Sequence, residues 1–508
     1  MNKILPVLFV LCSCQFSIRA QSPRTNAASY DVKNFGAKGN GVDMDTKSIN
    51  SAIEAAAKAG GGTVYFPAGN YLSGSIHLKS NITLYLDAGA TIIAAPGENA
   101  DEYDLPEHKI DNMYEDFGHR HWHNSLIWGE NLHDISIIGS GMIWGKGLER
   151  SNKGEDDKRP NKSISLYLCR NVIIRDISMS HAGWFGILAT GVDNLTIDNV
   201  KMDTNRDGMD IDCCQNVRIS NCSINSPEDD GICLKSSYGL GFARATENVM
   251  ITNCQVSGFE EGSFFDGTYK HTNSERPIGR IKMGTESNGG FKNITISNCV
   301  FEYCRGLALE TVDGAQLEDV TINNITMRDI VNAPIFLRLG ARMRGPAGTP
   351  VGTLRRVIIS NIVAYNVDGK AGAIISGIPG NDIEDISLHD INIYFKGGGT
   401  KEQASIEVPE LENGYPEPGS FGVTPAYGFF VRHVNGISFD NIHLGLMSND
   451  ERPSFVLDSV KNASFRFVNT PVRPGHGNLY LKNAENVKIF QSFDAKDSTI
   501  KEASFVKM

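Results

Sequence analysis

The chain has 508 residues, of which 52 are glycine and 41% are hydrophobic, and its formal net charge is −11. This acidic balance excludes the basic surface that nucleic-acid binding requires, and no bilayer-spanning apolar run follows the N-terminus. Phosphate-binding loops, nucleotide fingerprints and covalent-nucleophile constellations are absent from the sequence, so we expect no cofactor and no resident metal.

The first residues are typical of a secretory signal. A lysine precedes an apolar stretch from Ile4 to Phe16, so residues 1–20 predict a signal peptide cleaved near Ala20. The segment Leu11–Cys14 also fits a lipoprotein signal, a less favoured alternative. Either signal exports the chain to the periplasm or the outside, and we expect residues 28–508 to form a single domain.

Residues 28–62 predict a cap. It contains a strand, a Gly-rich turn and a helix from Thr46 to Lys58, with Asp45 as the N-cap and Gly60 beyond its end. The helix has one apolar face, which would cover the open end of the first coil. Alternating strands of the coils then follow over about residues 63–495.

The stretch 96–123 breaks this alternation and predicts a polar loop. A metal site is conceivable there, although the spacing of the histidines and acids matches no standard ligand pattern. These residues are His108, Asp111, Glu115, Asp116, His119, His121 and His123.

A short phrase recurs along the rest of the chain, with apolar residues at every second position followed by Asn or Asp. A strand-period phrase that returns about once per coil is typical of a parallel β-solenoid. Residues at matching offsets should then stack about 4.8 Å apart in neighbouring coils. The aligned positions are Asp176, Asn199, Asn221, Asn253, Asn298, Asn324, Asn361, Asp390 and Asn441.

The repeated Asn positions predict ladders of side chains that hydrogen-bond between coils. They also create N-x-[ST] matches, which we interpret as part of the strand repeat and not as glycan acceptors. The matches are Asn194, Asn221, Asn293 and Asn324.

Ten cysteines in an exported chain invite a disulfide interpretation. Cys222, Cys254 and Cys299 share one inward offset, which favours a buried stack of free thiols. Pairing of Cys299 with Cys304, or of the vicinal Cys213 with Cys214, stays open.

Three aspartates follow two of the repeats. Asp207 lies eight residues after Asn199 and Asp229 lies eight after Asn221, so both should occupy the same corner of successive coils, with Asp230 next. Burial of unpaired acids would be costly, so we expect a surface site where repulsion raises at least one pKa. One protonated acid beside one ionised base is what glycoside hydrolysis needs. A solvated acidic turn or a calcium site fits the spacing equally well, and strict alternation demands a bend if Asp229 and Asp230 act together.

Several motifs resemble glycoside hydrolase family 28, the polygalacturonases and related pectin hydrolases. They are VKNFGAKGNGVDMDT, GGGTVYFPAGNYLSGSIHLKSNITLYLDAGAT, Asn205-Arg-Asp207-Gly and Asp229-Asp230-Gly-Ile-Cys-Leu-Lys-Ser. The resemblance covers residues 30–330 clearly and the remainder loosely. It implies a right-handed parallel β-helix whose aspartates hydrolyse the glycosidic bond with inversion. Asp229 would be the general acid, and Asp207 and Asp230 the bases, with the carboxyls separated by about 6.5–9.5 Å.

The chain departs from the family pattern where a Gly-His-Gly motif is expected. That stretch is Gly258 to Gly262, with Glu260 and Glu261 in place of the histidine. An insertion follows, and His271 within it is a candidate to return to the site.

A second departure concerns the family's Arg-Ile-Lys motif, whose aligned position holds Arg305 to Glu310. A literal Arg280-Ile-Lys282 lies one coil earlier, and the two cations share strand parity. Without the usual pair for a galacturonate carboxylate, the pattern favours another pectic linkage, such as a rhamnogalacturonan fragment or a branched oligosaccharide. Further candidates for substrate binding are Asn205, Lys235, Arg338, Arg342 and Arg344.

The segment from Lys396 to Phe430 interrupts the register and predicts a loop over one end of the carbohydrate groove. Aromatic residues on such a loop either stack on sugars or pack against the coils. A walled groove predicts exo action. The aromatic residues are Tyr415, Phe421, Tyr427, Phe429 and Phe430.

We therefore predict an exported pectic glycoside hydrolase that acts as a monomer on a pectic oligo- or polysaccharide, without a nucleic-acid partner or a transmembrane segment. A calcium-dependent pectate-lyase-like enzyme and a noncatalytic glycan-binding solenoid are the alternatives. The lyase would release an unsaturated, ultraviolet-absorbing sugar, and the binder would show no turnover.

Overall fold

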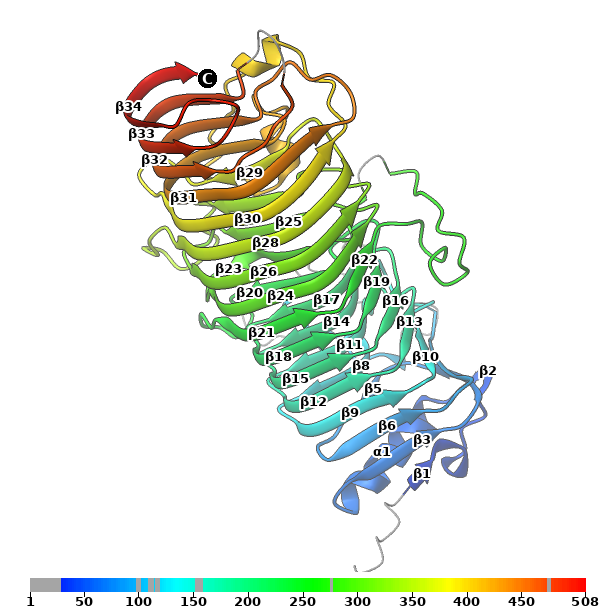
Figure 1. The fold of residues 1–508 in the computed structure, drawn as a ribbon. Coiled ribbons are helices and arrows are strands. Elements are labelled where there is room, and N and C mark those ends of the chain that lie inside the picture. The colour runs from blue at the N-terminus through cyan, green and yellow to red at the C-terminus, as the bar shows by residue number, and fades with distance from the viewer. Residues whose placement is uncertain are drawn as a thin grey trace, which may run out of the picture.

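The computed structural model describes residues 29–96, 102–107, 114, 119–150, 159–274, 277–472 and 477–508. Figure 1 shows a long parallel β-helix with the N-terminal helix at one end and the C-terminal strand at the other. The predicted all-β solenoid is therefore confirmed. The predicted signal peptide lies outside the described residues, as do four residues of the polar loop, His108, Asp111, Glu115 and Asp116.

Each coil contributes strands to three parallel sheets, because every strand pairs with the corresponding strand one coil later. The first sheet comprises β5 (Ile76–His77), β8 (Ser125–Glu130), β11 (Lys162–Tyr167), β14 (Phe185–Thr190), β17 (Asp207–Asp212), β20 (Ile232–Ser236), β23 (Ile281–Ser287), β25 (Leu307–Thr311), β27 (Ile335–Leu339) and β29 (Ala373–Ser376). The second comprises β1 (Ser29–Asp31), β3 (Gly62–Phe66), β6 (Ile82–Leu86), β9 (His133–Gly139), β12 (Arg170–Arg175), β15 (Asp193–Asp198), β18 (Gln215–Ser220) and β21 (Thr246–Thr252). The third comprises β2 (Asn40–Met44), β4 (Gly69–Ser73), β7 (Ala90–Ala94), β10 (Met142–Trp144), β13 (Ser178–Ser180), β16 (Lys201–Asp203), β19 (Ser223–Asn225) and β22 (Gln255–Ser257).

Farther along the chain, long bent strands join the second sheet to its neighbours. They are β24 (Phe291–Glu302), β26 (Gln316–Arg328), β28 (Thr353–Val367), β30 (Ile383–Phe395), β31 (Phe429–Leu446), β32 (Phe455–Arg466) and β33 (Leu479–Phe490). The last strand, β34 (Ser498–Lys507), pairs with β33 antiparallel and so covers part of the final open edge. The inward side chains of all coils form one continuous apolar core.

The N-terminal cap agrees with the predicted helix, since α1 spans Thr46–Lys58. Its Ile49 and Ile53 are fully buried against the first coil. Asp45 is the N-cap residue as predicted, but its side chain makes no capping hydrogen bond to the helix. The carboxylate instead accepts hydrogen bonds from the backbone amides of Lys38 and Gly39, which holds the preceding turn.

The recurring Asn and Asp residues occupy corners between sheets, in the left-handed backbone region. All nine aligned positions have φ between 52° and 65°. Asn is among the few non-glycine residues that adopt this conformation readily. Its amide then reaches the residue one coil earlier, as from Asn199 to Asp176 at 2.9 Å and from Asn324 to Asn298 at 3.1 Å. The predicted ladders are confirmed, and the four N-x-[ST] asparagines donate within them.

Replacing Asn253 by Ala is expected to lower the free energy of unfolding by about 1–2 kcal/mol, because Ala adopts the left-handed region reluctantly. Asn253 has a φ of 56° and bonds to Asn221 at 3.3 Å. Asn253→Gly adopts the left-handed backbone conformation without strain and loses the ladder hydrogen bond. It should therefore lower the free energy of unfolding by less than Asn253→Ala does. Urea unfolding of the two variants measures the difference, and equal costs would show that the ladder bond, not the backbone, dominates.

The cysteine prediction is also confirmed, since all eight cysteines of the described residues are buried free thiols. Cys222, Cys254 and Cys299 take the inward positions expected of small apolar residues. The alternative pairings of Cys299 with Cys304 and of Cys213 with Cys214 do not occur.

Within the part of the chain that the structure describes, no helix has the length and apolar character needed to cross a membrane.

Candidate active site

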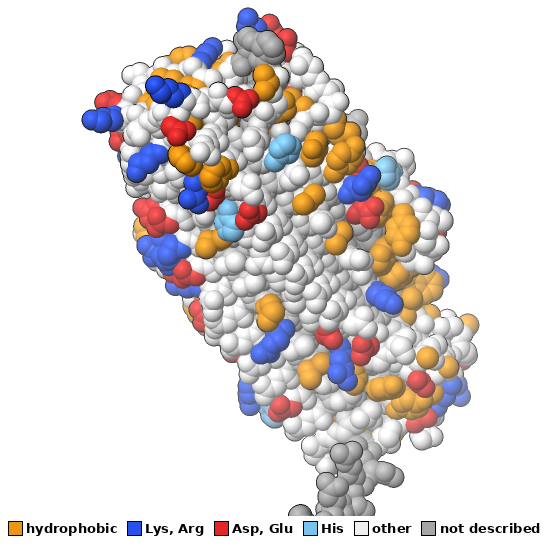
Figure 2. Space-filling model, viewed as in Figure 1, with side chains coloured by type: hydrophobic (Ala, Val, Ile, Leu, Met, Phe, Trp, Pro, Cys, Tyr) orange, Lys and Arg blue, Asp and Glu red, His pale blue; other side chains and the backbone are white. Residues whose placement is uncertain are grey.

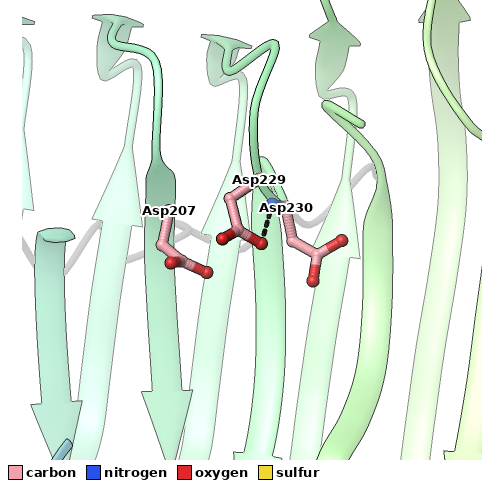
Figure 3. A group of neighbouring side chains, drawn as sticks. All are labelled: Asp207, Asp229 and Asp230. Carbon is pink, nitrogen blue, oxygen red and sulfur yellow. Dashed lines mark hydrogen bonds between the residues drawn. The ribbon is translucent and has the colours of Figure 1, made fainter. Parts of the chain in front are cut away.

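The three aspartates meet where the chain enters the first sheet in two successive coils. Asp207 begins β17, and Asp229 and Asp230 lie in the turn just before β20. Figure 3 shows the three side chains side by side at the start of these adjacent strands. One carboxylate oxygen from each residue lies within 4.8 Å of the others. The sequence prediction that these acids form one cluster is therefore met.

The register differs by one residue from the expected alignment of Asp207 with Asp229. In the third sheet Met202 pairs with Ile224, a separation of 22 residues, whereas in the first sheet Met209 pairs with Ile232, a separation of 23. The turn before β20 thus holds one extra residue, and Asp230 takes the place beside Asp207. The extra residue supplies the required bend, which is fixed where the Asp230 amide donates to Asp229 Oδ1 at 3.0 Å.

The acids lie on the outer face of the coil and not in the apolar core. Asp207 is 4% exposed and Asp230 3% exposed, while the side chain of Asp229 is 24% exposed. Asp229 is therefore the member that a ligand in solvent reaches first. Their closest oxygens are nearer than the carboxyl separation of about 6.5–9.5 Å that we expected for inversion. A span of this size matches two hydrogen bonds of about 2.8 Å to one shared water.

Asp230 is held ionised by two cations of the next coil. Burial alone would raise its pKa, but Lys282 and Arg280 hold the pKa well below its usual range. Arg280 Nε lies 2.8 Å from Asp230 Oδ1, and Lys282 Nζ lies 3.3 Å from Oδ2. Asp230 is therefore the member of the cluster whose ionised form is favoured.

The other two acids have raised pKa values. Burial, then the charge of Asp230, raises the pKa of Asp229, although Arg206 opposes this from 2.7 Å. Burial, then the charges of Asp229 and Asp210, raises the pKa of Asp207 well above its ordinary value. We expected Asp207 to be a second ionised base, but its environment favours the protonated form. The two acids titrate as a coupled group beside an ionised Asp230.

The two cations from the literal Arg-Ile-Lys stretch do face the aspartates together. Ile281 pairs with Ile232, so Arg280 and Lys282 lie in the coil directly after the double Asp. Lys282 pairs with Ala308 in the following coil, which confirms the expected one-coil offset.

Glu310 and Arg305 belong to that following coil and complete this group of charges. Burial raises the pKa of Glu310 to about 7, against the lowering effect of Lys282, whose Nζ lies 3.7 Å from Glu310 Oε2. Arg305 binds Glu417, 2.7 Å from its Nη1.

Lys235 and Asn205, two predicted substrate-binding residues, belong to the same two coils as the aspartates. Lys235 points outward from β20 and lies 3.0 Å from Glu286 and 3.7 Å from Asp210. His119 reaches the same network from the polar loop, with Nε2 3.0 Å from Asp210 Oδ2. Asn205 Oδ1 is buried and accepts no hydrogen bond from the residues that the structure describes.

The expected replacements for the family histidine do not reach the aspartates. Residues 258–274 belong to an excursion between β22 and β23, so Glu260 and Glu261 do not lie on the strand with which the sequence alignment matched them. Glu260 is exposed, and Glu261 pairs with Arg150. His271 lies on the surface of this excursion, stacked on Tyr303 with ring centroids 3.8 Å apart. The reason is the length of the insertion, which projects from the solenoid in Figure 1.

A long excursion between β30 and β31, residues 397–428, lies over the outer face of the first sheet, and we call it the strap. Arg338 donates to the carbonyls of Glu410 and Leu411, both at 2.8 Å, so it anchors the strap and is not free for substrate. Arg342 is likewise engaged, by Asp313.

Of the five aromatic residues expected over the groove, Phe421, Tyr427, Phe429 and Phe430 are buried, so they pack against the coils. Tyr415 is 55% exposed, while its hydroxyl bonds to Thr285 Oγ1 at 3.0 Å. Tyr415 is thus the one member of this set that is exposed.

Several residues of the site carried no usable sequence signal. His119 and Glu417 come from excursions whose paths are not encoded by the strand repeat. Arg206 stood inside the Asn205-Arg-Asp207-Gly motif but resembled a spacer. Asp210 could have been found from the sequence. It is separated from Asp212 by one residue in the strand, so both side chains point to the same, outward face, and the residues between the acids of this strand are apolar or glycine.

The three aspartates are also close enough to hold a metal ion. Two cations already neutralise Asp230, and two of the three acids are recessed. A divalent ion would be repelled by Arg280 and Lys282, so the donor set fits a calcium site poorly.

The chain is a parallel β-helix with a cluster of aspartates at the start of its first sheet. This combination is typical of β-helix proteins that act on carbohydrates. Residues 29–110 match the family described as rhamnogalacturonase A/epimerase, pectate lyase-like, and residues 160–267 match the right-handed β-helix region. The solenoid is thus of the right-handed type.

Comparison with individual proteins narrows the class. The chain is 24% identical over 405 residues to a probable polygalacturonase of Vitis vinifera, covering 74% of this chain and 76% of that protein. A family 28 exopolygalacturonase of Yersinia enterocolitica has a TM-score of 0.67 at 18% identity, covering 88% of this chain and 79% of the other. A hyperthermoactive exopolygalacturonase of Thermotoga maritima has a TM-score of 0.55 at 18% identity and covers 94% of each chain. The resemblance to glycoside hydrolase family 28 is confirmed, and the chain is polygalacturonase-like.

Proposed function

We propose that the protein is a glycoside hydrolase that cleaves a glycosidic bond in pectic material. The observation that carries this proposal is the meeting of three carboxylates within 4.8 Å, of which Asp230 is bound by Arg280 and Lys282. The cations lower the pKa of Asp230, while the pKa values of Asp229 and Asp207 are raised. General acid–base hydrolysis needs such a split within reach of one bond. The similarity to polygalacturonases supports the choice of pectin.

In the proposed reaction Asp229 donates its proton to the glycosidic oxygen as the bond to the anomeric carbon breaks. Asp230 removes a proton from a water molecule whose oxygen attacks that carbon. Asp207, kept protonated by burial and by its neighbours, holds the same water by a hydrogen bond. The products gain one water between them, and the proton returns from Asp230 to Asp229 through solvent. We keep inversion at the anomeric carbon as part of the proposal.

Exo action is supported by the strap. It covers the outer face of the first sheet on the C-terminal side of Asp230, where Arg338 and Arg432 hold its carbonyls. A polysaccharide then has no straight path across that side. Small products should appear first from a long pectic chain, and early mid-chain fragments would contradict this part of the proposal.

We also propose that the protein is exported and monomeric. Cell fractionation tests the export, and light scattering tests the monomeric state.

The pH profile follows from the two opposite pKa shifts. Raising the pH deprotonates Asp229 and removes the acid, and lowering the pH protonates Asp230 and removes the base. Because the pKa of Asp229 is raised and that of Asp230 is lowered, kcat/KM should form a plateau that includes the ordinary Asp pKa of about 3.9. A profile with its acid limb above the ordinary Asp pKa of about 3.9 would contradict this assignment.

A further inference from the structure

The strap carries a carboxylate into the group of cations beside Asp230. Glu417 accepts two parallel hydrogen bonds from Arg280, Nη1 to Oε1 at 3.0 Å and Nη2 to Oε2 at 2.9 Å. Arg305 Nη1 donates to the same Oε1 at 2.7 Å. This forked arrangement is how a guanidinium binds any carboxylate, including that of a uronic acid.

The neighbouring cations are also satisfied by the chain itself. Lys282 lies between Asp230 and Glu310, and Lys235 lies between Glu286 and Asp210. The side chain of Arg280 is 2% exposed. A sugar carboxylate that entered here would have to displace one of these acids to find a positive partner.

The strap is held to the coils by hydrogen bonds and by apolar packing. Arg432 donates to the carbonyls of Val408 and Pro409 at 2.9 and 2.6 Å. Phe421 packs with Phe336 and Phe430 in a separate buried apolar cluster. The ionised form of Glu417 is favoured as well, because Arg280, Arg305 and Lys282 together lower its pKa against the effect of burial.

We propose that Glu417 determines specificity by occupying the place of a sugar carboxylate, so that the sugar unit bound between Asp230 and the strap is neutral. A uronate there would add a negative charge beside Asp230 and Glu417, while the cations that the structure describes around them, Arg280, Arg305 and Lys282, are already paired with acids, which is an unfavourable arrangement. The exposed ring of Tyr415 offers such a neutral sugar an apolar surface instead. This inference rests on the proposed hydrolase function and specifies its substrate class: a pectic glycoside with a neutral sugar at this position.

The direct test compares D-galacturonate with D-galactose, which differ in a carboxylate against a hydroxymethyl group. Calorimetric titration of the parent protein should show galacturonate binding no more tightly than galactose. Glu417→Gln frees Arg280 and Arg305 and should strengthen galacturonate binding at least tenfold, with galactose unchanged. Glu412→Gln, an exposed acid on the same strap, should behave as the parent. Tighter galacturonate binding by the parent, or no gain in Glu417→Gln, overturns the proposal.

A measurement on the parent protein alone covers the case in which Glu417→Gln does not fold. Pectic oligosaccharides ending in a neutral sugar should be hydrolysed with at least tenfold higher kcat/KM than matched oligosaccharides ending in galacturonate, and the reverse ranking overturns the proposal. Failure of the parent to hydrolyse any of them refutes the proposed hydrolase function, whereas the monosaccharide titration still tests Glu417 by binding.

Discussion

Replacing Asp229 by Asn is expected to reduce turnover of a pectic substrate by a factor of about 10²–10⁴, the usual contribution of a positioned general acid. The amide keeps the shape of the side chain, but its N–H groups are not acidic enough to protonate the leaving oxygen. Folding should be unaffected, because the site already disfavours the charged form of Asp229. Initial rates of reducing-sugar release, with the thermal midpoint measured in parallel, check both statements.

Asp176→Asn is the matched control for this substitution. Asp176 lies in the ladder at a left-handed corner, where Asn is equally suited, and it accepts from Asn199 at 2.9 Å. The same carboxylate-to-amide change should therefore leave turnover at the parent level. If Asp229→Asn retained turnover within about threefold of the parent, less than one kcal/mol of the barrier, Asp229 would not be the general acid.

The second large effect is expected for Arg280→Met. Arg280 is buried and joins Asp230 to Glu417, so its loss removes one cation from each of two recessed carboxylates. Breaking a buried ion pair from one side costs about 3–5 kcal/mol, and urea unfolding should show a loss of that size. The pKa of Asp230 should rise as well, which moves the acid limb of the pH profile upward.

Arg466→Met provides the comparison for Arg280→Met. Arg466 also forms a pair with an aspartate, Asp440, but its side chain is 59% exposed. Water replaces the lost partner there, so the unfolding transition should stay where it is in the parent. Equal effects of the two substitutions would mean that the Arg280 network does not stabilise the fold.

Most of the architecture could be predicted from local patterns. The Asn positions recur because each corner needs a left-handed residue, and that need is visible in the sequence without coordinates. The helix Thr46–Lys58 was equally accessible, because its apolar face and terminal glycine are local features. The grouping of Asp207 with Asp229 and Asp230 followed from counting residues from one corner to the next.

The remaining parts depend on contacts that no local pattern encodes. One extra residue in the turn before β20 placed Asp230, and not Asp229, beside Asp207. Counting residues from Asn221 could not reveal this extra residue, because it lies in the bend and changes the register only in the strand that follows. The predicted positions of His271 and Glu261 were wrong because both residues belong to the excursion between β22 and β23 and not to a strand of the first sheet. Glu417 comes from more than 130 residues beyond Arg280 in sequence and reaches it only through the path of the strap.

Figure 2 shows one face of the solenoid, coloured by the type of side chain. The face in this view is broad and largely free of coloured charged or apolar side chains in its centre. A groove over the second sheet, with a volume of 710 Å³, is lined by residues such as Asn293, Thr321 and Ser438. Carboxylates with opposite pKa shifts instead gather at the start of the first sheet. The chemistry therefore points to the charged site and not to this groove.

The central claim is that Asp229 and Asp230 hydrolyse a pectic glycoside, and proton NMR of the first-formed product tests it most directly. Defined pectic oligosaccharides are digested by the parent and by Asp229→Asn, and the anomeric signals and the ultraviolet absorbance are followed from the first minutes. The account predicts a new saturated reducing sugar of inverted configuration with the parent and almost none with Asp229→Asn. An unsaturated, ultraviolet-absorbing product that disappears with a calcium chelator would contradict it and establish a lyase.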